Sequence, residues 1–185
     1  MFSEVIRTRR AVFPAQYNGE EVSEEEIRTI LDAAHFAPTH KRTEPWRFKV
    51  LFSEESRKGL SEFLATTYKN TATKFSELKF RKISEKPLQS VCVIAICMQR
   101  DPTASVPEWE EIAATAMAVQ NMWLTAHELK IGAYWSSPAL KDHLQEHIHI
   151  PEGEKCLGFF YMGKYDVALP EPFRNGSIEE KTTWI

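Results

Sequence analysis

The stretch that constrains the fold most is residues 105–132, which the sequence predicts to be one long helix. Ser105 and Glu108 have the spacing of a capping box. Lys130 and Gly132 have the pattern of a helix that stops in the left-handed conformation. Apolar side chains cover nearly its whole circumference: Ile112, Ala113, Ala116, Met117, Ala118, Val119, Met122, Trp123, Leu124, Ala126 and Leu129. A surface helix carries one apolar stripe, so this helix must be covered on nearly every side.

Two arrangements meet that requirement. The helix is either the centre of one globule, or it is shared between the core of one chain and a partner subunit. Because the chain has only 185 residues, we favour the second arrangement and expect a homodimer. Polar residues interrupt the helix, among them Thr115, Gln120, Asn121 and His127, so we do not expect it to cross a membrane.

Composition excludes several classes of protein. A formal net charge of −3 argues against general nucleic-acid binding. The N-terminus has no apolar leader, so we expect a cytoplasmic protein. The three cysteines form no CxxC pair and are expected to be buried free thiols. An apolar content of 43% suits one globular domain spanning residues 1–185.

The remaining elements are predicted from apolar periodicity and caps. Helices are expected at residues 2–10 (with Ser3 as cap), from Ser23 to just before Pro38, at 53–65 and at about 138–147. Strands are expected at residues 46–52, 88–98, 133–136 and 155–164. Residues 66–86 are left open between a broken helix and a mobile cover, and a tail begins at residue 165. Helices and strands mix without a regular βαβ rhythm, which indicates the α+β class.

Two polar segments are candidates for a functional site. The first predicted helix ends in Arg7, Arg9 and Arg10. These are either a solvated helix end or an anion site, since guanidinium groups bind phosphate as a fork. The second candidate is the long loop at residues 37–48, which is pinned by two prolines and precedes a strand.

Other chemistries find little support. The histidines at positions 143, 147 and 149 lack a hydrolytic zinc motif, so we expect no metal site. No GxGxxG or GxSxG motif is present. Cys97 has no neighbour in the sequence that would lower its pKa, which argues against a nucleophile.

Five short motifs in a fixed order carry a family resemblance. They lie at residues 6–11 (IRTRRA), 37–48 (APTHK, then EPWRF), 106–109 (VPEW), 132–136 (GAYWS) and 158–163 (GFFYMG). In this order they closely resemble the nitroreductase superfamily, and most of all its short, single-domain branch. The resemblance covers nearly the whole chain.

The resemblance implies a fold, a partner and a cofactor. The expected fold is α+β, with a central, mostly antiparallel sheet flanked by helices and a long apolar helix at the core of a homodimer. One FMN is expected in each of two sites at the subunit interface. The tail, about residues 165–185, is expected to wrap the partner subunit.

The resemblance also implies which residues hold FMN. Arg9 and Arg10 are expected at the phosphate, with Ala11 where a serine is common, and Arg174 is expected to reach the same phosphate. The loop that contains Thr39, His40 and Arg42 is expected to contact flavin partly from the other subunit. Trp135, Ser136 and Ser137 match the segment that lies along the flavin ring. The chain departs from the family pattern at three positions: Pro14 replaces an arginine, and Arg42 and Glu44 replace amide side chains.

The implied activity is that of an FMN-dependent oxidoreductase. It would take hydride from NAD(P)H and reduce nitroaromatic, quinone or related acceptors by a ping-pong mechanism. The flavin performs the chemistry, so no catalytic protein residue is nominated. Alternatives are dehalogenation or an oxidative ring transformation on the same scaffold, or a non-catalytic dimeric flavin-binding module.

Overall fold

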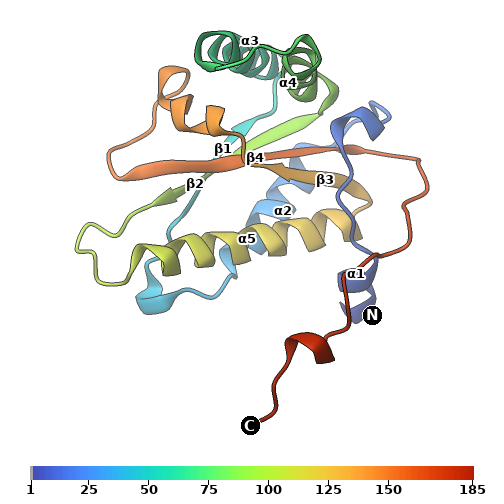
Figure 1. The fold of residues 1–185 in the computed structure, drawn as a ribbon, viewed down its shortest axis with the longest axis vertical. Helices are drawn as coiled ribbons and strands as arrows, with labels where there is room; N and C mark the ends of the chain where they lie inside the picture. Colours follow the sequence, from blue (N-terminus) through green and yellow to red (C-terminus); the bar gives the residue numbers. More distant parts are fainter. Residues whose placement is uncertain (1) are drawn as a thin grey trace.

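A computed structural model of the chain describes residues 2–185 and has one four-stranded sheet. Its strands are β1 (Trp46–Leu51), β2 (Cys92–Gln99), β3 (Ile131–Ser136) and β4 (Glu154–Lys164), in the order β1-β2-β4-β3. All three neighbouring pairs are antiparallel. The predicted α+β class with an antiparallel sheet is therefore confirmed, and β3 lies at an edge of the sheet (Figure 1).

Helices cover both faces of this sheet (Figure 1). On one face lie α2 (Glu24–His35) and α5 (Glu108–Glu128), and on the other lie α3 (Glu54–Thr71), α4 (Glu77–Gln89) and the 3₁₀ segment η3 (Ala139–Glu146). The short helix α1 (Phe2–Thr8) contacts α5. No helix within residues 2–185 is both long enough and apolar enough to cross a membrane.

Strand β2 shows why one run of the sequence is apolar without interruption. Ile94 and Ile96 pack in the cluster that includes α2 and α5, whereas Val93 and Ala95 pack in the cluster beneath α3 and η3. Since successive side chains of a strand point to opposite faces, a strand covered on both faces must be apolar at every position.

The ends of α5 differ from the prediction. The helix begins at Glu108 after Pro107, and the Ser105 hydroxyl donates to the Asp101 carboxylate instead of capping the helix. At the other end it is Lys130 that takes a positive φ, of 57°. Gly132 is already part of β3. The predicted capping box and the glycine stop were therefore wrong.

Several other boundaries differ as well. Ser3 lies inside α1 and is not its cap. In residues 66–86, α3 continues to Thr71, and α4 then begins after the cap residue Ser76, whose hydroxyl accepts from the backbone N–H of Lys79. Leu88, assigned to a strand from its apolar neighbours, belongs to α4.

One face of α5 is not covered by the chain to which it belongs. Ala118, Met122 and Ala126 are fully buried against the sheet and α2. By contrast, the side chains of Trp109 and Met117 are 67% and 40% exposed. The predicted all-round covering of this helix is therefore not achieved within a single chain.

The tail after β4 leaves the body of the molecule and runs past α1 (Figure 1). Most of its side chains are exposed, including Phe173 and Trp184, and its only regular segment among residues 165–185 is the 3₁₀ turn η4 (Glu179–Lys181). A hydrogen bond from Arg10 Nε to the Pro170 carbonyl, 3.1 Å long, ties it to the segment that follows α1. That the tail wraps a partner stays a prediction.

Candidate functional site

Three arginines lie together beside α1: Arg9 and Arg10, which are adjacent in sequence, and Arg174 from the tail. Burial lowers the pKa of Arg9 from its ordinary value, and the nearby positive charges of Arg174 and Arg10 lower it further. Within residues 2–185, none of these three guanidinium groups forms an ion pair with a carboxylate. Since like charges repel and no counter-charge is supplied, this arginine cluster, as we call Arg9, Arg10 and Arg174, favours a bound anion.

Arg10 uses only some of its donors within the chain. Its Nη1 donates to the carbonyls of Arg7 (2.7 Å) and Arg9 (2.8 Å), and its Nε donates to the carbonyl of Pro170. A guanidinium group has five N–H donors, so the two on Nη2 are left for another acceptor. The helix-end and anion-site interpretations are therefore compatible for this side chain.

Two residues of α5 complete the surroundings of Arg9. Its guanidinium carbon lies 4.5 Å from the centroid of the Trp123 ring, which packs edge-on against Phe160. His127 lies one helical turn after Trp123. Burial lowers its pKa, and the positive charges of Arg9 and Arg10 lower it further, so the neutral imidazole is favoured. Its Nε2 is 2.9 Å from Thr8 Oγ1. A cation over an indole face is stabilised by the ring quadrupole, which fixes the orientation of Arg9.

The second predicted part of the site lies on the edge strand β3. The backbone N–H of Val12 donates to the Ala133 carbonyl (3.1 Å), so the chain just after the arginines runs beside this edge. In an antiparallel strand alternate residues face the same neighbour, so the backbone groups of Trp135 also point away from β4. Ser136 and Ser137 follow at the open end of the strand.

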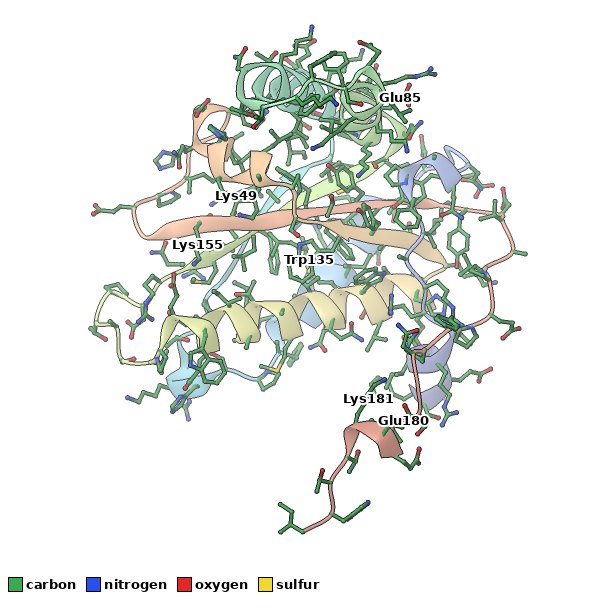
Figure 2. The ribbon with its side chains drawn as sticks, viewed as in Figure 1. Lys49, Glu85, Trp135, Lys155, Glu180 and Lys181 are labelled. Atoms are coloured by element: carbon green, nitrogen blue, oxygen red, sulfur yellow. The ribbon has the colours of Figure 1, made fainter. Side chains whose placement is uncertain are left out.

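The Trp135 side chain lies between the sheet and α5 (Figure 2) and packs against the core on that face. Its indole N–H is buried without a hydrogen-bond partner in the structure, and so is that of Trp123. A buried donor left without an acceptor costs about 1–3 kcal/mol, so each of these two groups lowers the stability of the core locally.

The third predicted part, the loop with Thr39, His40 and Arg42, lies at the other end of α5. His40 Nδ1 is 2.5 Å from Glu110 Oε2, and Thr39 Oγ1 is 3.2 Å from Thr43 Oγ1. Arg42 has a φ of 56°, in the left-handed region that non-glycine residues seldom adopt. The loop is therefore strained and is held in place by contacts at its base.

The length of α5 separates this loop from the arginine cluster. At 1.5 Å per residue, the distance along the helix from Glu110 to His127 is about 25 Å. The structure therefore brings Arg9, Arg10 and Arg174 together, and places them at the start of the strand that leads to Trp135 and Ser136, but it does not bring the loop to them. One chain alone does not assemble all the predicted site residues around one ligand.

A model of the nitroreductase family matches residues 6–164. The chain belongs to the nitroreductase family. The Bacillus subtilis (strain 168) protein named "Putative NAD(P)H nitroreductase YfhC" is 26% identical over 182 residues, 97% of this chain and 92% of that protein. The crystal structure of the nitroreductase-like family protein from Bacillus cereus is 28% identical, with a TM-score of 0.83 over 100% of this chain and 96% of that one. A Bacteroides fragilis nitroreductase with bound FMN, 21% identical, has the same fold, with a TM-score of 0.73 over 100% of this chain and 98% of its own.

Two residues near the site of this nitroreductase-family chain were not predicted from its sequence. Trp123 and His127 were seen only as part of the long helix. Residues four apart lie on the same face of a helix, so Trp123 and His127 are neighbours near the end of α5. This spacing of an aromatic residue and a histidine was the one sequence signal that pointed to them. Nothing in the sequence indicated that Arg9 would lie over the ring of Trp123.

The other polar candidates do not assemble a site. His143 Nδ1 is 2.8 Å from Glu146 Oε1, and the His147 ring stacks on Phe63 with centroids 5.0 Å apart. No group of three or more potential metal ligands occurs among residues 2–185. The three cysteines are free and buried, as predicted, and burial raises the pKa of the Cys92 thiol to about 12.

Proposed function

We propose that the chain is an FMN-dependent oxidoreductase that takes hydride from NAD(P)H and reduces nitroaromatic, quinone or related small acceptors by a ping-pong mechanism. Its membership of the nitroreductase family supports this, as does the name of its Bacillus subtilis relative. The single observation that carries the proposal is the arginine cluster, in which three guanidinium groups lie together and, among residues 2–185, none is paired with a carboxylate. A flavin mononucleotide brings the dianionic phosphate that such a cluster suits.

The residues present fit that cofactor. Arg9, Arg10 and Arg174 would hold the phosphate. The outward backbone groups of Trp135, with Ser136 and Ser137, would contact the ring and keep it against the edge of the sheet. When bound, the flavin supplies hydride and electron transfer, so the chain itself needs to bind, orient and exclude water. The side chain of Ala11 is a methyl group, so only the backbone at this position could form a hydrogen bond with the cofactor.

The proposal includes a homodimer. The exposed Trp109 and Met117 on α5 would be covered by a second copy, which would expose a large apolar surface on separation. A second copy would also bring its loop with Thr39, His40 and Arg42 to the arginine cluster, from which the same chain's loop is about 25 Å away along α5. The exposed tail would lie on the same partner.

The activity is tested by anaerobic titration of the purified FMN-loaded protein with NADH and with NADPH. We expect loss of the oxidised flavin absorbance, followed by its return on addition of a nitroaromatic compound or a quinone. Initial rates at several fixed NAD(P)H concentrations should give parallel lines. A flavin that neither nucleotide reduces would contradict the enzyme and favour a non-catalytic flavin-binding module.

The phosphate site is tested by titrating FMN and riboflavin against the wild type, Arg9→Ala, Arg10→Ala and the control Arg28→Ala. The control removes an exposed guanidinium that pairs with Glu24 on α2. Loss of one charge-assisted hydrogen bond should weaken FMN about 10- to 100-fold. Riboflavin, which lacks the phosphate, should bind all four proteins alike. Unchanged FMN affinity in both Arg9→Ala and Arg10→Ala would show that the arginines only end a helix.

A further inference from the structure

The α3–α4 layer contains a cavity of about 640 Å³, away from the arginine cluster. Lys74, Lys79, Lys82 and Lys86 line it, from the α3–α4 connection and from successive turns of α4. No acidic side chain is among its lining residues. Its volume lies in the range of small-molecule sites, and we call it the lysine pocket.

The lysines of this pocket are not neutralised by the chain. Within residues 2–185, none of the four ammonium groups forms an ion pair, and two lie over aromatic rings instead: Lys79 over Tyr68 (5.2 Å) and Lys86 over Tyr134 (5.1 Å). Like charges three or four residues apart destabilise a helix. An arrangement of this kind calls for negative charge from outside the chain.

On another face of α4, a basic side chain is paired with an acidic one, as is usual on an exposed helix. Arg81 pairs with Glu85 at a distance of 2.6 Å, one turn along α4. Figure 2 shows Glu85 at the outer side of the helical layer. If the lysines served only solubility, carboxylates would be expected among them too, as on this face. The absence of acidic residues from the pocket lining therefore separates the pocket from an ordinary charged surface.

The remaining walls of the pocket are apolar. Tyr68 and Leu140 are buried beneath it, and Ile83 is half-buried at its side. A cavity that combines an apolar wall with several unpaired cations suits a molecule with an aromatic body and a carboxylate, sulfonate or phosphate group. An inorganic anion would leave the apolar wall unused.

The position of the pocket relates it to the proposed flavin. Pro138, Ala139 and Leu140 line the pocket and directly follow Ser137, which is proposed to contact the ring. Strand β3 therefore leads from the end of α5, where the arginine cluster lies, to the lysine pocket, over about 20 Å for its six residues. A ligand of the pocket would lie next to the segment that holds the reacting part of the cofactor.

We propose that the lysine pocket binds the electron acceptor and selects acceptors with an aromatic body and a negative charge. This inference rests on the proposed function for the redox step, whereas the binding of the anion is independent of that step. The four ammonium groups would raise the local concentration of the anionic acceptor and orient its charged end away from the flavin. Neutral acceptors of the same shape would lack this contribution.

The probe is 4-nitrobenzoate, and its neutral counterpart is 4-nitrobenzyl alcohol. Both are measured with the FMN-loaded wild type, with Lys79→Gln/Lys82→Gln and with the control Lys58→Gln, which removes an exposed lysine of α3 that pairs with Glu54. The double variant should lose about tenfold or more in kcat/KM for 4-nitrobenzoate. It should keep its kcat/KM for the alcohol, and the control should match the wild type with both. Added salt should weaken only the reaction of the anion.

Two further measurements decide the remaining alternatives. Calorimetric titration of 4-nitrobenzoate into the oxidised protein should give binding that the double variant loses and the control keeps. If the lysine substitutions leave both binding and kcat/KM unchanged, or slow only reduction by NADPH, the pocket is not an acceptor site. Lysine-dependent binding without any turnover would instead support the anion pocket and refute the oxidoreductase.

Discussion

The separation of the loop from the arginine cluster leads to a prediction about mixed dimers. The two parts lie about 25 Å apart along α5 in one chain, farther than any side chain reaches. If they act on one ligand, each site must take its arginines from one copy and its loop from the other. Substitutions in the two parts should then complement each other in a mixed dimer, but only when the arginine substitutions are on one copy and the loop substitutions are on the other.

The experiment uses two copies of the chain with different affinity tags, co-expressed and purified through both tags. One copy carries Arg9→Ala/Arg10→Ala, and the other carries His40→Ala/Arg42→Ala. A mixed dimer of these copies has one doubly damaged site and one intact site, so it should retain about half an FMN per chain, by two-fold symmetry. Each variant alone has two damaged sites and should retain little FMN after gel filtration.

The matched control places all four substitutions on one copy and pairs it with a wild-type copy. Both sites of that dimer lack one part, so its FMN content should fall to the level of the single-variant dimers although the number of substitutions is the same. Equal FMN content in the two mixed dimers would refute a site shared between copies. Full FMN content in the loop variant alone would remove the loop from the site.

Two further predictions concern stability. Glu111, a buried carboxylate of α5, accepts from the Arg100 guanidinium and, at 2.9 Å, from the Asp101 backbone N–H. Glu111→Ala should therefore lower the free energy of unfolding by about 3–5 kcal/mol in urea titrations, and a loss below 1 kcal/mol would contradict the importance of this pair. The side-chain hydroxyl of Ser105, then the backbone of the same turn, lower the pKa of Asp101. Because the folded-state pKa is depressed, this contribution is present above the unfolded pKa of about 3.9 and is lost as the pH falls through the folded value. Between pH 5 and pH 2, thermal melts should show a smaller fall in Tm for Asp101→Asn than for the wild type, because the variant lacks this carboxylate. Parallel plots of Tm against pH for the two proteins would refute this role.

Much of the fold followed from local signals. Ser23 and Glu26 form the capping box that their spacing predicts, and the run at Cys92 forms the doubly covered strand. Local signals failed where tertiary contacts decided. Gly132 suggested a helix end, but its lack of a side chain serves close packing, since a Cβ there would lie 2.8 Å from Val12 Cβ. Lys130 takes the left-handed turn in its place, so that β3 can begin directly afterwards.

The candidate site was predictable in its parts but not in its assembly. Arg9, Arg10 and Arg174 were named from motifs, and the structure places them together. Nothing in the sequence around Trp123 indicates that a guanidinium group from the N-terminal segment lies over its ring. Such contacts depend on how α1 and α5 pack against each other. Residues that meet in this way are far apart in sequence, so no local pattern of side chains predicts the contact.

The unbroken course of α5 has a consequence for how sequences of this kind can change in length. One inserted residue in the helix would shift everything beyond it by about 1.5 Å and rotate it by about 100°. Trp123 would turn away from Phe160 and from Arg9, and the two ends of the helix would no longer face the same partners. Insertions and deletions should therefore be tolerated in an exposed, irregular connection such as residues 18–21, before α2, and excluded from α5. The helix therefore fixes the distance between the loop with His40 and the arginine cluster, the two parts of the proposed site.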